Sequence, residues 1–367
     1  NKTSAVLLKK ILIERLYAIN SYEYKGQNYK FSANNIAKAV EELDVSLNEG
    51  LIVANEKITN HLLLGTSYEE NLDDGTKKSF SFKYIDFENI ENNHFFVTEE
   101  FIVDRANQNE SVKSRRPDLI VFVNGIPLVV IELKKSSVNY ENGIKQLEKE
   151  QKKDEIPHLF KYIQLTIAGN SNEARYGTVG TPLKFYSLWR EEENDKAKAI
   201  LKTMITDREI SSLDLTLFAL LSKDRLLRLI KHYILFDKKV KKVSRYQQFF
   251  GIEKTLERVA KIDENGIRAG GLIWHTQGSG KSLTMVMLTK LLKLTYTNAK
   301  IIVVTDRVDL DEQIHRTFEN SDIKAGRASS GSDLIEKLQS GISVITTLVH
   351  KFEKVQNSKI TIKDNNI

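Results

Sequence analysis

Residues 275–282 read His275-Thr276-Gln277-Gly278-Ser279-Gly280-Lys281-Ser282. An apolar run at 271–274 precedes this stretch and predicts a strand, and a helical pattern follows it over 283–294. A glycine-rich loop between a strand and a helix surrounds phosphate oxygens with backbone N–H groups and the positive end of the helix. We therefore expect a nucleotide site in which Lys281 reaches the β- and γ-phosphates and Ser282 binds Mg²⁺.

Composition limits the classes of protein that the chain can belong to. The 367 residues predict two or three domains, and the net charge of +6 favours an acidic partner such as nucleic acid. The lack of cysteine excludes disulfides and thiolate metal sites, and the seven histidines show no zinc spacing. No apolar run approaches 18 residues and no signal peptide opens the chain, so we expect no membrane contact and a cytoplasmic location. The chain opens at Asn1 rather than at a methionine, which predicts a fragment.

The elements that we expect change character along the chain. Residues 1–64 look mainly helical, and 80–104 carry short strand-like runs. The stretch 223–245 holds nine Lys or Arg against two Asp, which fits either a solvated helix face or a track along a DNA backbone. Residues 246–367 alternate helices and apolar strands, a parallel βαβ pattern. The strand candidates are 119–123, 128–133, 163–168, 184–188, 271–274, 300–305 and 342–346.

A second chemical site lies upstream, where Arg116-Pro117-Asp118 is followed by Glu132 and Lys134. Two carboxylates can hold a hard cation that polarises a phosphate and lowers the pKa of water, and a lysine can stabilise the charge that develops on the phosphate. This set predicts Mg²⁺-dependent cleavage of phosphodiesters. A bare Glu-x-Lys at the end of a surface strand is the alternative reading.

Strand geometry makes this second site testable. Glu132 and Lys134 share one face of their strand, and Asp118 must join that face from the neighbouring strand. A strict two-residue loop at Asn124-Gly125 would pair residue 118 with 131 and put Glu132 on the wrong face. We therefore expect an odd-numbered loop or a bulge, for example a three-residue loop with Gly125 in the left-handed region.

The two sites, in this order, resemble the R (restriction and translocation) subunit of type I restriction–modification enzymes, and the resemblance spans nearly the whole chain. His275 at the first loop position is usual for that family. The stretches that carry the resemblance are 115–134, 156–160, 185–190, 245–248, 272–282, 304–310 and 346–347.

The resemblance implies a role for each matching residue. Asp118, Glu132 and Lys134 look like the nuclease triad, with Asp118 and Glu132 as metal ligands. The glutamine implied in reading the adenine is Gln248, with Gln247 as the alternative. The other residues implied in binding ATP and its Mg²⁺ are Thr276, Gln277, Gly278, Ser279, Gly280, Lys281 and Ser282. The residues implied in facing DNA are Thr305, Asp306, Arg307, Thr346 and Thr347.

Three features depart from the family pattern. Many nucleases of this group carry Gln-x-x-x-Tyr on a helix after the triad. Here the glutamine is Gln146, and Glu150 stands four residues later, where the pattern has Tyr. The family's upstream helical acid has only Glu41 and Glu42 as candidates. The acidic motor motif would come just after Ile367, followed by a second motor domain with its arginine finger, so we expect this stretch alone not to hydrolyse ATP.

The residues and the resemblance together predict an α/β chain. A restriction-endonuclease-like domain with a mixed sheet (1–190) would precede a helical basic linker (191–244) and an incomplete first RecA-like domain with a parallel sheet (245–367). The implied function is ATP-dependent translocation and Mg²⁺-dependent cleavage of double-stranded DNA, in a complex with methyltransferase (M) and specificity (S) subunits. The alternatives are another nuclease–motor fusion, such as a type III-like enzyme, and a non-catalytic nucleotide-dependent DNA-binding module.

Overall fold

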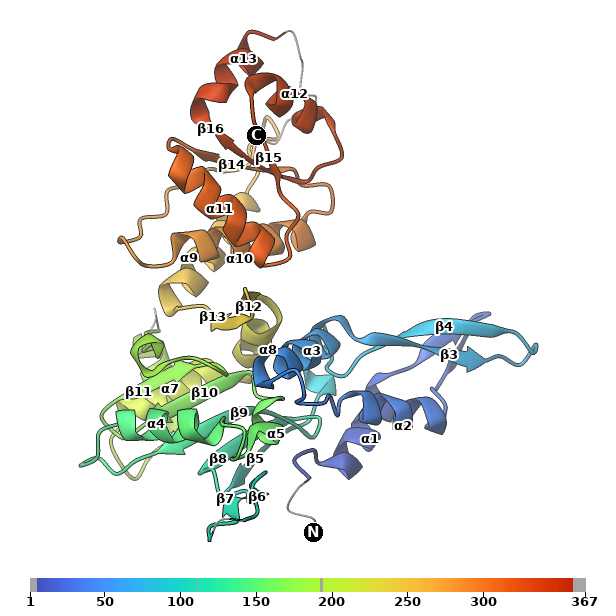
Figure 1. Cartoon of the computed structure of the whole chain (residues 1–367), viewed down its shortest axis with the longest axis vertical. Helices are drawn as coiled ribbons and strands as arrows, with labels where there is room; N and C mark the ends of the chain where they lie inside the picture. The colour runs from blue at the N-terminus through green and yellow to red at the C-terminus, as the bar shows by residue number, and fades with distance from the viewer. Residues whose placement is uncertain (1–4, 110, 192–193, 359–367) are drawn as a thin grey trace. The chain divides into compact units, whose positions relative to one another are not determined.

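The computed structural model describes residues 5–109, 111–191 and 194–358, which form two compact units (Figure 1). The first unit comprises Asn1–Ile234 with Lys239–Val243, and the second comprises Leu235–Lys238 with Ser244–Ile367. The helices of the expected linker, 191–244, therefore lie within the first unit. The acidic motif expected after Ile367 lies outside the described residues.

A mixed five-stranded sheet forms the centre of the first unit, in the order β11-β10-β9-β8-β5. Its strands are β5 (Phe95–Glu99), β8 (Leu119–Val123), β9 (Ile126–Leu133), β10 (Leu165–Gly169) and β11 (Ala174–Gly177). Strands β9 and β10 run parallel, and the other neighbours are antiparallel. Nearly every residue of β8 and β9 is buried, as continuous apolar runs predict for strands covered on both faces.

Helices and short hairpins surround this sheet. The described helices are α1 (Lys9–Ile19), α2 (Ala33–Glu42), α3 (Leu51–Leu64), α4 (Glu141–Glu150), α5 (Pro157–Phe160), α6 (Asn194–Met204), α7 (Ser212–Leu221) and α8 (Lys223–His232), with the 3-10 turns η1 (Ile90–Asn92) and η2 (Leu183–Phe185). The short strands pair as β1 (Tyr22–Tyr24) with β2 (Gln27–Tyr29), β3 (Thr66–Asn71) with β4 (Lys77–Phe82), and β6 (Val103–Asp104) with β7 (Ser114–Arg115). Helix α4 packs on β9 and β10, and α7 packs on β11. The mainly helical character expected for 1–64 is confirmed.

A buried lysine ties the last strand of the first unit to its core. Strand β12 (Ile234–Asp237) pairs with β13 (Val240–Val243). From β13, Lys241 Nζ donates to Asn55 Oδ1 and to Gln164 Oε1, each at 2.7 Å. Burial lowers the pKa of Lys241 well below its usual value. These contacts fix β13 against α3 and against the residue that precedes β10.

A three-stranded parallel sheet in the order β14-β16-β15 forms the second unit. The elements of this unit are α9 (Tyr246–Val259), α10 (Lys281–Thr295), β14 (Ile301–Thr305), α11 (Val308–Asn320), β15 (Gly326–Arg327), α12 (Gly331–Gln339), β16 (Val344–Leu348), η3 (Val349–Lys351) and α13 (Phe352–Gln356). Its apolar core joins α12 to β16 through Leu334, Leu338 and Ile345. The expected parallel strands at 300–305 and 342–346 and the helix after residue 282 are confirmed. Within residues 5–109, 111–191 and 194–358, no helix is long and apolar enough to cross a membrane.

Two expected strands are wrong. Residues 271–274 form no strand, because no described strand pairs with their backbone. The side chains of Leu272 and Trp274 are exposed, each residue at 86%. Residues 184–188 begin in η2, and only Ser187 pairs with another chain segment, through a single bridge to Tyr176. The strand that occupies this sheet edge is β11, which the sequence did not predict.

Candidate active site

A tight turn and a bulge shape the β8–β9 hairpin. Asn124 and Gly125 connect the strands with φ angles of 53° and 85°, the pair of positive values that a type I′ turn requires. The pairing then shifts between Val121 and Phe122, which leaves Leu128 as an extra residue on β9. The hairpin therefore has a two-residue loop with a bulge inside the strand.

This bulge restores the parity that the chemistry requires. Leu119 pairs with Ile131, so the preceding Asp118 lies opposite Glu132 rather than opposite residue 131. The prediction of an odd loop or a bulge is confirmed by the bulge. The three-residue loop that we offered as an example is wrong, because the extra residue lies inside β9.

Hydrogen bonds at the end of β9 hold the three residues of the second site, Asp118, Glu132 and Lys134. Asp118 Oδ2 accepts the backbone N–H of Leu133 at 2.6 Å, and Lys134 Nζ donates to Glu132 Oε1 at 2.5 Å. The backbone N–H of Lys134 donates to Gly169 O at 2.8 Å, which continues the ladder between β9 and β10. The Asp118 carboxylate is thus fixed by the backbone of β9, and the Lys134 ammonium by the Glu132 side chain.

The electrostatics of Glu132 are those of a buried acid. Glu132 is 2% exposed, and this burial raises the pKa of its carboxyl group to about 7. The nearby Asp118 raises the pKa further, whereas Lys134 lowers it. The second oxygen of Glu132, Oε2, is buried and has no hydrogen-bond partner. A buried carboxylate oxygen without a partner is expensive, so this atom calls for a ligand that the chain itself does not supply.

The donor set fits Mg²⁺. The described residues contain no group of three or more His, Cys, Asp or Glu that could hold a metal. Asp118 and Glu132 offer two carboxylates at this end of the hairpin. Mg²⁺ prefers oxygen ligands and usually keeps several waters beside one or two carboxylates. The unpartnered Oε2 of Glu132 is the atom that such a cation would satisfy.

The loop at 275–282 has the backbone of a phosphate cradle. Gly278 and Gly280 have φ angles of 76° and 85°, and α10 begins directly after Gly280. Lys281 Nζ donates to His275 O and Thr276 O, both at 3.0 Å. The ammonium group therefore lies on the carbonyl oxygens of its own loop.

Gln248 on α9 binds the backbone of this loop. Its Nε2 donates to Ser279 O at 3.3 Å and to Gly280 O at 3.1 Å, and its Oε1 accepts from Arg245 N at 2.8 Å. Both ends of the amide are therefore occupied by the backbone. To read an adenine as the resemblance implies, Gln248 would have to give up some of these contacts.

The residues that the resemblance places beside DNA fall into two groups. Asp306 and Arg307 follow β14 and have side chains that are 75% and 76% exposed, with 3.8 Å between Oδ1 and Nε. Thr305 is 8% exposed, and Thr346 and Thr347 on β16 are fully buried. Their burial leaves the side chains of Thr346 and Thr347 no access to DNA as the strand is folded here.

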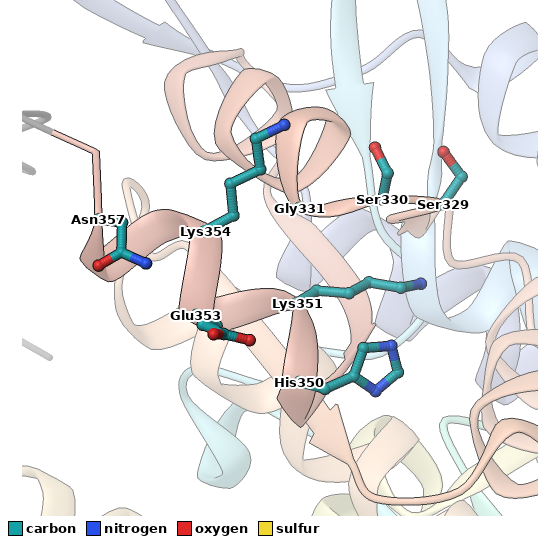
Figure 2. Close-up of a pocket in the computed structure, with 8 residues that line it drawn as sticks. All are labelled: Ser329, Ser330, Gly331, His350, Lys351, Glu353, Lys354 and Asn357. Carbon is teal, nitrogen blue, oxygen red and sulfur yellow. The ribbon is translucent and has the colours of Figure 1, made fainter.

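A basic pocket of about 390 Å³ opens in the second unit (Figure 2). Two segments line it, the loop that leads into α12 and the η3–α13 stretch. Lys351 Nζ donates to Ala328 O, and Lys354 Nζ donates to Ser332 Oγ at 2.5 Å. The residues that line the pocket are Ser329, Ser330, Gly331, His350, Lys351, Glu353, Lys354 and Asn357.

Two known families match successive parts of the chain. Residues 1–185 match the family described as Type I restriction enzyme R protein N terminus. The chain belongs to this family. Residues 247–367 match a second family, described as SWI2/SNF2 ATPase, which covers the loop at 275–282.

Individual relatives give the same result for most of the chain. A Methanocaldococcus jannaschii protein, provisionally named as type I restriction enzyme MjaIXP endonuclease subunit, is 33% identical over 81% of this chain and 30% of its own length. The type I restriction enzyme HindI endonuclease subunit of Haemophilus influenzae is 32% identical over 83% of this chain and 28% of its length. The matches thus span less than a third of these R proteins.

Helix α4 adds residues beside Lys134 that the sequence only partly indicated. Gln146 Oε1 accepts from Lys134 Nζ at 2.9 Å, so this glutamine contacts the lysine of the triad. Glu150 lies one turn further along α4 and accepts from Gln146 Nε2 at 3.1 Å. Its position, where the family pattern has Tyr, was the available signal. Glu42, a candidate for the upstream acid, instead accepts from Tyr68 on β3.

Proposed function

We propose that the chain carries the nuclease centre and the nucleotide-binding part of the motor of a type I restriction enzyme. The whole subunit would move along double-stranded DNA with ATP and cleave it with Mg²⁺. The observation that carries the proposal is the bulge in β9, which brings Asp118 and Glu132 face to face beside Lys134. A strand end that served only packing would need neither the parity correction nor a buried acid with an unpartnered oxygen.

In the nuclease centre, Asp118 and Glu132 would hold Mg²⁺. The bound cation would supply Lewis acidity toward the scissile phosphate and lower the pKa of a water molecule. Lys134, whose ammonium already lies 2.5 Å from Glu132 Oε1, would stabilise the negative charge that develops on the phosphate oxygens. The rigid ladder from Lys134 N to Gly169 would keep this charge in position.

In the motor, the loop at 275–282 would bind the phosphates of ATP. Lys281 would leave His275 O and Thr276 O for the β- and γ-phosphates, and the N-terminus of α10 would favour the negative charge. Ser282 would hold the Mg²⁺ that accompanies ATP. Gln248 would keep the loop in shape from α9 whether or not it also reads the base.

We place DNA along the basic parts of the second unit. Arg307 at the end of β14 is exposed, and Lys351 and Lys354 line the pocket of Figure 2. Such cations bind phosphates without reading the sequence. The names of the relatives describe endonuclease subunits, which supports a multi-subunit complex, and we propose M and S subunits as the partners.

The nuclease proposal is tested with the full-length subunit and supercoiled plasmid DNA. We expect Mg²⁺-dependent nicking that Lys134→Ala lowers by about 10²–10³-fold, the loss typical when a group that stabilises transition-state charge is removed. Lys135→Ala, on the neighbouring residue, is the matched control and should leave the rate unchanged. Nicking at the wild-type rate by Lys134→Ala would remove this triad.

The motor proposal is tested in the assembled complex by measuring ATP hydrolysis in the presence of DNA. Lys281→Ala should abolish turnover, because the ammonium group that would stabilise the negative charge on the transferred phosphoryl group is lost. Lys293→Ala, near the other end of α10, is the control on the same helix. Retained turnover in Lys281→Ala would contradict the phosphate-loop assignment.

A further inference from the structure

Helix α4 lies directly on the catalytic strands. Its buried face consists of Gly143, Ile144, Leu147 and Glu150, and it packs on β9 and β10. A Cβ added at Gly143 would lie 3.2 Å from Ala168 Cβ on β10, a tight contact, and 3.4 Å from the carbonyl oxygen of Glu132 on β9, an ordinary van der Waals contact. The face that carries Glu150 is therefore pressed against the strand that carries Glu132.

Glu150 is an acid in a place where packing alone would favour an apolar residue. It is 1% exposed, and its Oε2 is buried without a hydrogen-bond partner. Burying a carboxyl group that is only partly satisfied costs free energy, so a side chain with no other role here would be better replaced by Leu or Met. The hydrogen bond that Glu150 does make indicates what the group does.

That hydrogen bond belongs to a short chain of contacts that ends at the nuclease lysine. Lys134 Nζ donates to Gln146 Oε1 at 2.9 Å, and Gln146 Nε2 donates to Glu150 Oε1 at 3.1 Å. An ammonium group only donates, so the amide of Gln146 must present its oxygen to Lys134 and its nitrogen to the other side. A carboxyl group supplies an acceptor on that other side in either protonation state.

We propose that Glu150 is a positioning residue of the nuclease centre, which fixes the amide of Gln146 and thereby holds the ammonium of Lys134 against Glu132. This inference rests on the proposed nuclease function and adds a residue to it. With Glu150 replaced by an apolar residue, the amide of Gln146 loses its preferred orientation and can turn its nitrogen toward Lys134. Two donors then face each other, and the ammonium moves away from Glu132.

The test uses the full-length subunit and compares two substitutions at this one position. Glu150→Leu should lower the kcat of plasmid nicking by about 10–100-fold, the range for partners that orient a catalytic group, with KM for DNA unchanged. Glu150→Gln should stay within about threefold of wild type, because its Oε1 can still accept from Gln146 Nε2. Lys145→Ala, on the exposed side of the same helix, is the control and should have no effect.

A double-mutant cycle separates positioning from mere support of the fold. In a Lys134→Ala background, Glu150→Leu should cause no further loss, since the group that it orients is already absent. Gln146→Leu should reproduce the loss of Glu150→Leu, and it provides the same test if Glu150→Leu does not fold.

Several results would overturn the inference while leaving the nuclease proposal intact. These are wild-type kcat in Glu150→Leu or, if that variant does not fold, in Gln146→Leu; a Glu150→Gln variant as slow as Glu150→Leu; and a full additional loss in the Lys134→Ala background. Failure of the proposed function is a different outcome, in which the wild-type protein does not nick DNA or Lys134→Ala nicks normally.

Discussion

The β8–β9 hairpin and residues 271–274, which precede the loop at 275–282, are both apolar runs, yet only the hairpin forms strands. Val129 and Val130 are fully buried between neighbouring strands, whereas Leu272 and Trp274 are each 86% exposed. The difference lies in the partners. β9 pairs on both sides, with β8 and β10, while no described strand pairs with 271–274. An apolar run therefore becomes a strand only where neighbouring backbone completes its hydrogen bonds.

The largest effect that we predict breaks the hairpin at its turn. Gly125 has a φ of +85°, and an added Cβ would lie 2.8 Å from Leu8 O at the start of α1. Gly125→Ala should lower the free energy of unfolding of the first unit by about 3 kcal/mol, from backbone strain plus the clash. The control is Gly26→Ala, at φ +79° with open space around it, for which we expect about 1 kcal/mol.

The two tryptophans allow this effect to be assigned to one unit. Trp189 is 6% exposed in the first unit, whereas Trp274 is exposed in the second, so the red shift of emission in a urea titration reports mainly on the first unit. Equal losses in the two glycine variants would show that α1 yields freely to the new methyl group. The close packing of α1 on the turn would then contribute little to stability.

The next effect concerns the phosphate loop and uses a matched pair of glycines. An added Cβ at Gly280 would lie 2.6 Å from Gln248 Nε2, whereas the space around Gly278 is open, and both residues have positive φ. Gly280→Ala should weaken the binding of a fluorescent ATP analogue by about 30-fold or about 2 kcal/mol, and Gly278→Ala by less. Adding Gln248→Ala to Gly280→Ala should restore part of the affinity. An unchanged affinity in the double variant would mean that the clash with Gln248 is not the cause.

The sequence was sufficient for the hairpin because its constraints are local. The Asn-Gly turn, the apolar runs and the requirement that Asp118 and Glu132 share a face together demanded a bulge, and the bulge is present. The sequence did not predict that the bulge lies at Leu128, since any residue of β9 could have supplied it. The backbone carbonyl of Leu128 accepts the N–H of Gln164, a residue far along the chain.

Long-range contacts explain what else the sequence did not predict. Nothing near Lys241 indicates that its ammonium lies among Asn55 and Gln164, and a run of lysines normally indicates a solvated face. Glu150 likewise belongs to a charged helix, and only the packing of α4 on β9 shows that it is buried. Such residues become visible as functional candidates once the neighbours from other elements are known.

A third prediction concerns two buried acids, Glu132 on β9 and Glu150 on α4. Burial raises the pKa of Glu132 to about 7 and that of Glu150 to about 7, above the usual 4.5. Between pH 4.5 and 7 the folded chain therefore keeps protons that the unfolded chain has released, and this contribution to stability is lost as the pH rises. The slope is at most about 1.4 kcal/mol per pH unit for each group.

The measurement compares wild type with Glu132→Gln in urea titrations at pH 4.5, 5.5 and 7 with EDTA present. Acids remote from Glu132 contribute equally to both proteins, so the difference between them reports on Glu132 and on Glu150, whose pKa the charge of Glu132 helps to raise. We expect wild type to lose stability relative to the variant as the pH rises, and Mg²⁺ to restore part of that loss at pH 7 by favouring the ionised form. Parallel curves for the two proteins would contradict a raised pKa at Glu132.

The smallest effect that we predict tests whether Thr346 faces DNA, as the resemblance implies, or stays buried in β16, as it is here. Its Oγ1 is buried without a hydrogen-bond partner, so Thr346→Val should change the free energy of unfolding by no more than about 0.5 kcal/mol. The same variant should leave DNA-stimulated ATP hydrolysis by the assembled complex unchanged, whereas Arg307→Ala should lower it severalfold, because Arg307 is exposed. If Thr346→Val lowered this stimulation as much as Arg307→Ala, β16 would have to rearrange when DNA binds. The DNA-facing role that the resemblance implies for Thr346 would then hold in a conformation other than this one.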